Sequence, residues 1–124
     1  MNDDFWDYLQ RLVETNEIEI DRPKGSTHHR YRNGSYPVSY GFLRGTTAMD
    51  KGGVDIWVGS LGENRVVGAL CTVDLFKRDT ELKIVYDCTD EEIRSIITFI
   101  NDDQMRGIFI KKKNIKEPDD DLDT

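Results

Sequence analysis

The chain has 124 residues, 33 % charged and 37 % hydrophobic, with a formal net charge of −7 at pH 7 and a pI near 4.8. This length is typical of one domain with a modest core. The acidic balance argues against a nucleic-acid-binding protein, which needs a basic surface. No apolar run approaches the roughly 20 residues of a membrane helix, and the acidic N-terminus is not a secretory signal. We therefore expect a cytoplasmic protein without a nucleic-acid or membrane partner.

The first predicted element is an amphipathic helix over Asp3–Glu14. Its apolar residues recur at helical spacing and share one face: Phe5, Trp6, Leu9, Leu12 and Val13. Asn2 or Asp3 can cap its first turn. Two roles are open for the apolar face, packing across one end of the fold or forming a dimer interface.

A strand is predicted next over Glu17–Arg22, where polar and apolar residues alternate, and the turn sequence 23–26 ends it. The basic segment 27–34 follows. It is either a solvated hairpin loop or an anion clamp, in which Lys24 and Arg30 would bind phosphate oxygens.

The central stretch of the chain runs over residues 36–58 and combines tyrosines, glycines and carboxylates. Asp50 and Asp55 stand five positions apart across a Gly-Gly pair, so a folded-back loop can turn both toward one point. Oxygen ligands in that arrangement suit Mg²⁺. Tyr36 and Tyr40 are either core residues or ligands whose hydroxyls bind phosphate.

Three strands are predicted over Val54–Val58, Arg65–Phe76 and Thr80–Tyr86. The middle one is apolar nearly throughout, which is typical of a strand buried on both faces, and Gly68 within it indicates a bulge or a tight bend. Its cysteine, Cys71, and the later Cys88 lie in or beside apolar segments, and we expect free buried thiols.

A second acidic cluster spans the hairpin between the last two of these strands. It contains Asp74, Asp79, Glu81 and Lys83. Because side chains alternate along a strand, Glu81 and Lys83 should share one face. The cluster is either a solvated hairpin or part of a site with the carboxylates of the central stretch.

The last predicted elements are a helix over Thr89–Asn101 and a strand over Met105–Ile110. Thr89 and Glu92 have the spacing of a capping box. From Lys111 the chain becomes lysine-rich and then acidic. We predict one domain over residues 1–110 and a charged, disordered tail over 111–124.

Residues 36–58 resemble the signature of the soluble inorganic pyrophosphatases of the Mg²⁺-dependent, OB-barrel type. The Tyr-Pro-x-x-Tyr-Gly-Phe part is intact over 36–42, and Asp50 and Asp55 match the first and last aspartates of the acidic loop. Gly52 stands at the middle aspartate, the family's proposed base, and Gly53 at the usual proline. The Pro-Lys-Gly-Ser tetrapeptide and the Glu-Leu-Lys triplet at 81–83 extend the resemblance.

The resemblance implies an α+β fold, a small OB-like β-barrel of five to six strands with an N-terminal and a C-terminal helix packed on it. It implies Mg²⁺-dependent hydrolysis of diphosphate to two phosphates. The implied residues are Asp55 and Tyr40 for catalysis, Lys24, Arg30, Tyr36 and Lys83 for phosphate, and Asp50, Asp55, Asp79 and Glu81 for the metal.

Because Gly52 replaces the middle aspartate, the sequence leaves three functions open. The first is a phosphoanhydride hydrolase, weak or with an altered substrate, and the second is a noncatalytic phosphate- or nucleotide-binding module. The third is a structural or protein-interaction role. Homo-oligomerisation is also open.

Overall fold

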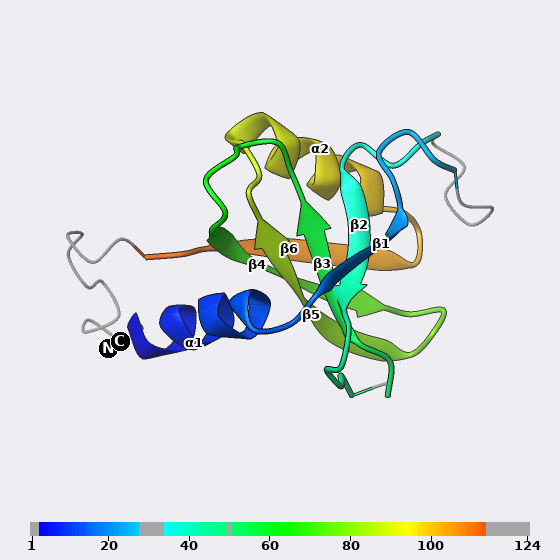
Figure 1. Ribbon diagram of the computed structural model, residues 1–124. Coiled ribbons are helices and arrows are strands. Elements are labelled where there is room, and N and C mark those ends of the chain that lie inside the picture. The colour runs from blue at the N-terminus through cyan, green and yellow to red at the C-terminus, as the bar shows by residue number, and fades with distance from the viewer. Residues whose placement is uncertain (1–2, 28–33, 50, 114–124) are drawn as a thin grey trace, which may run out of the picture.

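The structure is a computed structural model that describes residues 3–27, 34–49 and 51–113. Figure 1 shows one sheet with a helix on each side. In chain order the elements are α1 (Asp3–Glu14), β1 (Ile18–Arg22), β2 (Ser39–Leu43), β3 (Val54–Val58), β4 (Val66–Asp74), β5 (Asp79–Tyr86), α2 (Asp90–Ile100) and β6 (Met105–Lys111). Neither described helix has the length and apolarity needed to cross a membrane.

The six strands form one mixed sheet in the order β1-β2-β3-β5-β4-β6. β3 and β5 are parallel, whereas the other neighbouring strands pair antiparallel. The predicted α+β class, with short strands and two packed helices, is confirmed. The described sheet is open along β1 and β6, and its arrangement is compatible with the OB-like barrel that we expected.

Each face of the sheet carries its own apolar core. The first packs the inner face of α2 against the sheet and centres on Trp57, Leu70, Val85, Ile96 and Phe99. The second packs α1 against the opposite face and contains Trp6, Leu9, Val13, Leu43, Ile56 and Ile84. The helix α1 therefore packs most of its apolar stripe within this chain, which is the predicted packing role, although Phe5 stays 49 % exposed.

The helix α1 covers only part of its face of the sheet. Large apolar side chains remain exposed beyond it on β4, β5 and β6: Val73 (51 %), Leu82 (41 %), Ile108 (64 %) and Ile110 (44 %). The prediction that β4 is buried on both faces is therefore wrong at Val73. On the face of the sheet that carries α1, side chains are buried only where the helix covers them.

Two local signals, the capping box of α2 and the bulge in β4, are confirmed. Thr89 caps α2 and forms the predicted reciprocal capping box with Glu92. The register between β4 and β5 shifts between Val66 and Gly68, which is the predicted bulge. The strand β2 was not among the predicted strands. It pairs with both β1 and β3, and its Gly41 lies so close to β1 that a Cβ there would overlap the carbonyl oxygen of Glu19.

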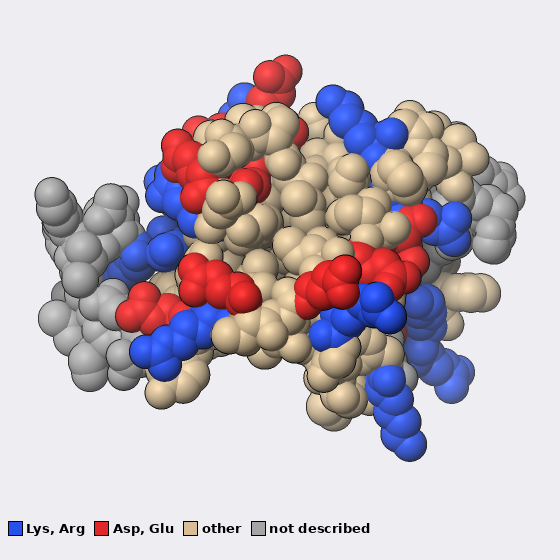
Figure 2. Space-filling view, in the orientation of Figure 1, with Lys and Arg blue, Asp and Glu red and all other residues tan. Residues whose placement is uncertain are grey.

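The predicted disordered tail begins at Lys111, but that residue is the last of β6, and the Lys112 N–H donates to the carbonyl of Val67 at 2.9 Å. The rest of the predicted tail, from residue 114, lies outside the described residues. Figure 2 shows patches of Asp and Glu over α1 and α2, with Lys and Arg among them.

Candidate functional site

Three neighbouring strands, β2, β3 and β5, place polar side chains on the face that α2 covers. Tyr40 pairs with Trp57, and Trp57 pairs with Val85, so these three side chains share one face. Positions two residues earlier on β3 and β5 must point the same way because side chains alternate along a strand. Those positions are Asp55 and Lys83.

The Lys83 ammonium is the centre of this group, which we call the Lys83 cluster (Tyr40, Asp55, Glu81 and Lys83). The ammonium donates to the Tyr40 hydroxyl at 2.8 Å, to Asp55 Oδ2 at 2.9 Å and to Glu81 Oε1 at 2.7 Å. The predicted shared face of Glu81 and Lys83 is thereby confirmed. An ammonium has three donor hydrogens, and this one meets three oxygen acceptors.

The Lys83 cluster is only partly open to solvent. The exposed fraction of the side chain is 10 % for Lys83, 16 % for Glu81 and 27 % for Asp55. Charge pairs at this depth are screened less by water than surface pairs are, and they matter more for the local electrostatics. Solvent still reaches the two carboxylates.

Burial sets the protonation state of Tyr40. Removal from water raises the pKa of the phenol well above its usual value, and the nearby Asp55 charge adds to this, against the opposing effect of Lys83. Tyr40 is therefore a neutral phenol at neutral pH.

Lys83 stays protonated because its hydrogen-bond partners affect its pKa more than burial does. Burial works to lower the pKa of the ammonium, but its three oxygen partners outweigh burial and raise the pKa above the usual lysine value. With Tyr40 neutral, the carboxylates of Asp55 and Glu81 are the charges that hold this cation.

An aromatic wall supports the cluster on its α2 side. The Tyr40 ring lies 4.6 Å from the Trp57 ring and 5.9 Å from the Tyr36 ring, centroid to centroid, and Tyr36 lies 4.8 Å from Phe99 of α2. Among the described residues the buried indole N–H of Trp57 has no hydrogen-bond partner, so ring packing holds it. The sequence analysis did not predict this support, although Asp55 and Trp57 stand two positions apart on one predicted strand and must therefore share a face.

The other predicted site residues are placed differently. Tyr36 is only 5 % exposed and lies within the aromatic wall. Lys24 follows β1, and its backbone N–H donates to Ser39 Oγ. Asp79 opens β5 opposite Asp74 and is not one of the three partners of the Lys83 ammonium. Asp50 and Arg30 lie outside the described residues.

Two carboxylates of the Lys83 cluster are suited to a hard cation. In the described part of the chain, no group of three or more His, Cys, Asp or Glu could hold a metal ion. Mg²⁺, however, is commonly held by one or two carboxylates together with water and substrate phosphate. Lys83 uses Asp55 Oδ2 and Glu81 Oε1, so the second oxygen of each carboxylate is not part of these contacts. The donor set fits that type of site.

No protein-family model matches this chain, and no curated protein sequence matches it. Solved structures do. An inorganic pyrophosphatase from Helicobacter pylori is similar at a TM-score of 0.55 and 16 % identity, over 76 % of this chain and 81 % of that one. An inorganic pyrophosphatase from Coxiella burnetii is similar at a TM-score of 0.54 and 15 % identity, over 73 % and 80 %. The chain therefore has a pyrophosphatase-like fold.

Proposed function

We propose that this protein is a Mg²⁺-dependent phosphoanhydride hydrolase resembling inorganic pyrophosphatase, which converts diphosphate and water to two phosphates. One observation carries the proposal: Tyr40, Asp55 and Glu81 come from three strands and converge on the Lys83 ammonium. The pyrophosphatase-like fold supports the choice of substrate class.

Asp55 and Glu81 would hold the metal ion, with Asp50 and Asp79 as further proposed ligands. The chemistry that Mg²⁺ supplies when bound is polarisation of phosphoryl oxygens and a lowered pKa of water. Hard carboxylate oxygens are the ligands this ion prefers.

Lys83 is the proposed phosphate-binding cation of the cluster. Its three donors already have acceptors, so a phosphoryl oxygen binds by replacing one of them. An ammonium there would neutralise charge that develops on the phosphoryl oxygens during transfer. Lys24, Arg30 and Tyr36 are the other proposed phosphate contacts.

Asp55 and Tyr40 are the proposed catalytic residues. Water adds to one phosphorus, the bridging P–O bond breaks, and the second phosphate leaves. Asp55 would take the proton that the water loses, because Gly52 offers no carboxylate in the loop. Tyr40, a neutral phenol between Asp55 and Lys83, would orient both.

The experiment measures phosphate release from diphosphate with Mg²⁺ for four proteins purified in the same way. These are the parent chain, Asp55→Asn, Glu81→Gln and the control Glu91→Gln. The control makes the same chemical change as Glu81→Gln at an exposed residue on α2. We expect release by the parent and by Glu91→Gln at equal rates, and a loss of about 100-fold or more in Asp55→Asn, the size typical of a lost proton-transfer group.

Absence of release from the parent chain would overturn the hydrolase proposal. A melting assay with imidodiphosphate then tests the noncatalytic phosphate-binding module on the same fold. Stabilisation of the parent but not of Lys83→Met would support that module. Equal release from the parent and from Asp55→Asn would assign the activity to a contaminant or to other residues.

A further inference from the structure

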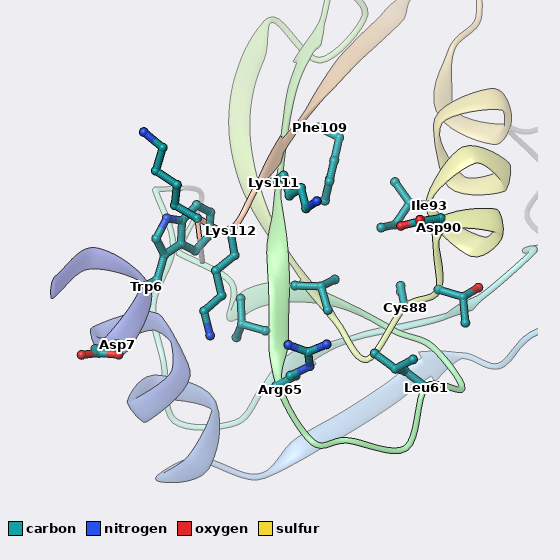
Figure 3. Close-up of a pocket in the computed structure, with 14 residues that line it drawn as sticks. Trp6, Asp7, Leu61, Arg65, Cys88, Asp90, Ile93, Phe109, Lys111 and Lys112 are labelled. Atoms are coloured by element: carbon teal, nitrogen blue, oxygen red, sulfur yellow. The ribbon is translucent and has the colours of Figure 1, made fainter. Parts of the chain in front are cut away.

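A second hollow lies away from the Lys83 cluster, between α1 and α2, where β4 begins and β6 ends (Figure 3). We call it the interhelix cleft. Its volume is about 740 Å³, which falls within the range of roughly 300–1,000 Å³ typical of small-molecule sites. No residue of the Lys83 cluster lines it.

The charge of the cleft lining is opposite to that of the chain. Four basic residues line it, Arg65, Lys111, Lys112 and Lys113, against two acidic residues, Asp7 and Asp90, whereas the whole chain carries −7. The basic lining of this hollow attracts an anion, whereas the acidic surface around it repels one.

Strand pairing brings the basic residues together from distant parts of the sequence. β4 and β6 are antiparallel, with Gly68 opposite Lys111, and the Lys112 N–H donates to the Val67 carbonyl at 2.9 Å. Arg65, just before β4, therefore lies beside the end of β6. Figure 3 shows the Lys112 side chain extending from β6 down toward the level of Arg65.

Arg65 is partly neutralised within the chain. Its Nε lies 2.6 Å from Glu63 Oε1, so Lys111, Lys112 and Lys113 supply most of the positive charge of the lining. Lys111 ends β6 and Lys112 follows it, and their side chains extend to different sides of the chain (Figure 3). They therefore flank the entrance of the cleft.

The α2 side of the cleft is mostly apolar and does not attract an anion. Phe109, Ile93, Leu61 and Cys88 line it, with Thr89 and the carboxylate of Asp90 at the start of α2. The α2 N-terminus is already satisfied by the Thr89–Glu92 capping box and has acidic residues in its first turn, so its dipole is used within the chain. The cleft thus has a cationic side at β6 and an apolar side toward α2.

We propose that the interhelix cleft binds a small organic anion, in which a carboxylate or phosphate group is carried on an aromatic or aliphatic body. The anionic group pairs with Lys111, which shares a face of β6 with Phe109, and the body packs on Phe109 and Ile93. Lys112, on the other side of the chain, adds to the positive charge at the entrance. The site is independent of the Lys83 cluster and of the proposed hydrolysis.

The test is a titration followed by amide shifts in two-dimensional NMR, without Mg²⁺. The probes are 1-naphthyl phosphate, 1-naphthoate and the neutral 1-naphthol. The two anions distinguish a phosphate from a carboxylate site, and inorganic phosphate tests whether the apolar body is needed. We expect saturable shifts at 65–67 and 109–112 with at least one naphthyl anion, and affinity at least tenfold weaker for 1-naphthol and for inorganic phosphate.

Variants locate the site. Lys111→Ala/Lys112→Ala should weaken anion binding at least tenfold, because it removes both cations. The control, Lys77→Ala/Arg78→Ala, removes two exposed cations from the hairpin at the opposite end of β4 and should change the affinity less than twofold.

Three results would overturn the proposal: 1-naphthol binding as tightly as the anions, affinity unchanged in Lys111→Ala/Lys112→Ala, or shifts confined to the surroundings of Lys83. The last result would instead place anion binding at the proposed hydrolase site. If Lys111→Ala/Lys112→Ala unfolds, Lys111→Gln/Lys112→Gln tests the same charge with longer side chains.

Discussion

The Lys83 ammonium lies 2.9 Å from Asp55 Oδ2 and ties β5 to β3, the parallel pair of the sheet. β4 separates these strands in the sequence, so the contact depends on the crossover and not on a hairpin. It also accounts for how two carboxylates stay close together at partial burial, since each would otherwise repel the other.

Replacing Lys83 by Met should destabilise the protein by about 2–3 kcal/mol. Removing one partner of a buried pair costs roughly 3–5 kcal/mol, and the partial exposure of Asp55 and Glu81 reduces that cost. Urea unfolding at pH 7 measures it. The exposed Lys77→Met should stay within about 0.5 kcal/mol of the parent. A loss as small as this in Lys83→Met would mean that the cluster contributes little to stability.

Stability should fall above pH 10. The folded pKa values of Tyr40 and Lys83 are both raised above unfolded values of about 10 and 10.4. Their stabilisation is therefore complete below those unfolded values and is lost as the pH rises through the higher folded values, by up to about 1.4 kcal/mol per pH unit for each group.

Urea unfolding between pH 8 and pH 11.5 checks this. The curve of the Tyr40→Phe/Lys83→Met variant should be shallower than that of the parent over the alkaline range, because neither titrating group remains. Parallel curves would show that these two groups do not change their pKa on folding.

Gly41→Ala should cost 2 kcal/mol or more. An added Cβ would overlap the carbonyl oxygen of Glu19 on β1, so β1 must move away from β2. Gly62→Ala is the comparison. Gly62 has open space around it but a φ of +78°, so Ala there costs roughly 1–2 kcal/mol. Urea unfolding of both variants measures the two costs, and a cost for Gly41→Ala no greater than that for Gly62→Ala would argue against the close approach of the two strands.

The two cysteines should differ in reactivity. Burial, together with the charges of Glu92 and Asp87, raises the pKa of the Cys88 thiol to about 12, so little thiolate forms at pH 8. Cys71 is partly exposed on β4. Iodoacetamide should therefore add once to the native protein, at Cys71, and twice in guanidinium, as read by peptide mass spectrometry. Equal labelling of the two thiols in the native protein would contradict the burial of Cys88.

Local sequence patterns were sufficient to predict both helices and most of the strands. The apolar spacing of α1 and the Thr89–Glu92 box of α2 act within a few residues, so they are legible in the chain. β2 was missed because its central Gly41 weakens a strand pattern. A glycine at this position allows β2 to approach Glu19 of β1 closely, and that contact lies between two different strands.

The sequence by itself determined that Glu81 and Lys83 share a face, because side chains alternate along any strand. It also provided Tyr40 and Asp55 as candidates through their resemblance to a known signature. Only the tertiary structure decided that Asp55 and Tyr40 meet the Lys83 ammonium, from 28 and 43 positions away. That meeting depends on β3 lying beside β5, a parallel pairing between distant strands that no local pattern encodes.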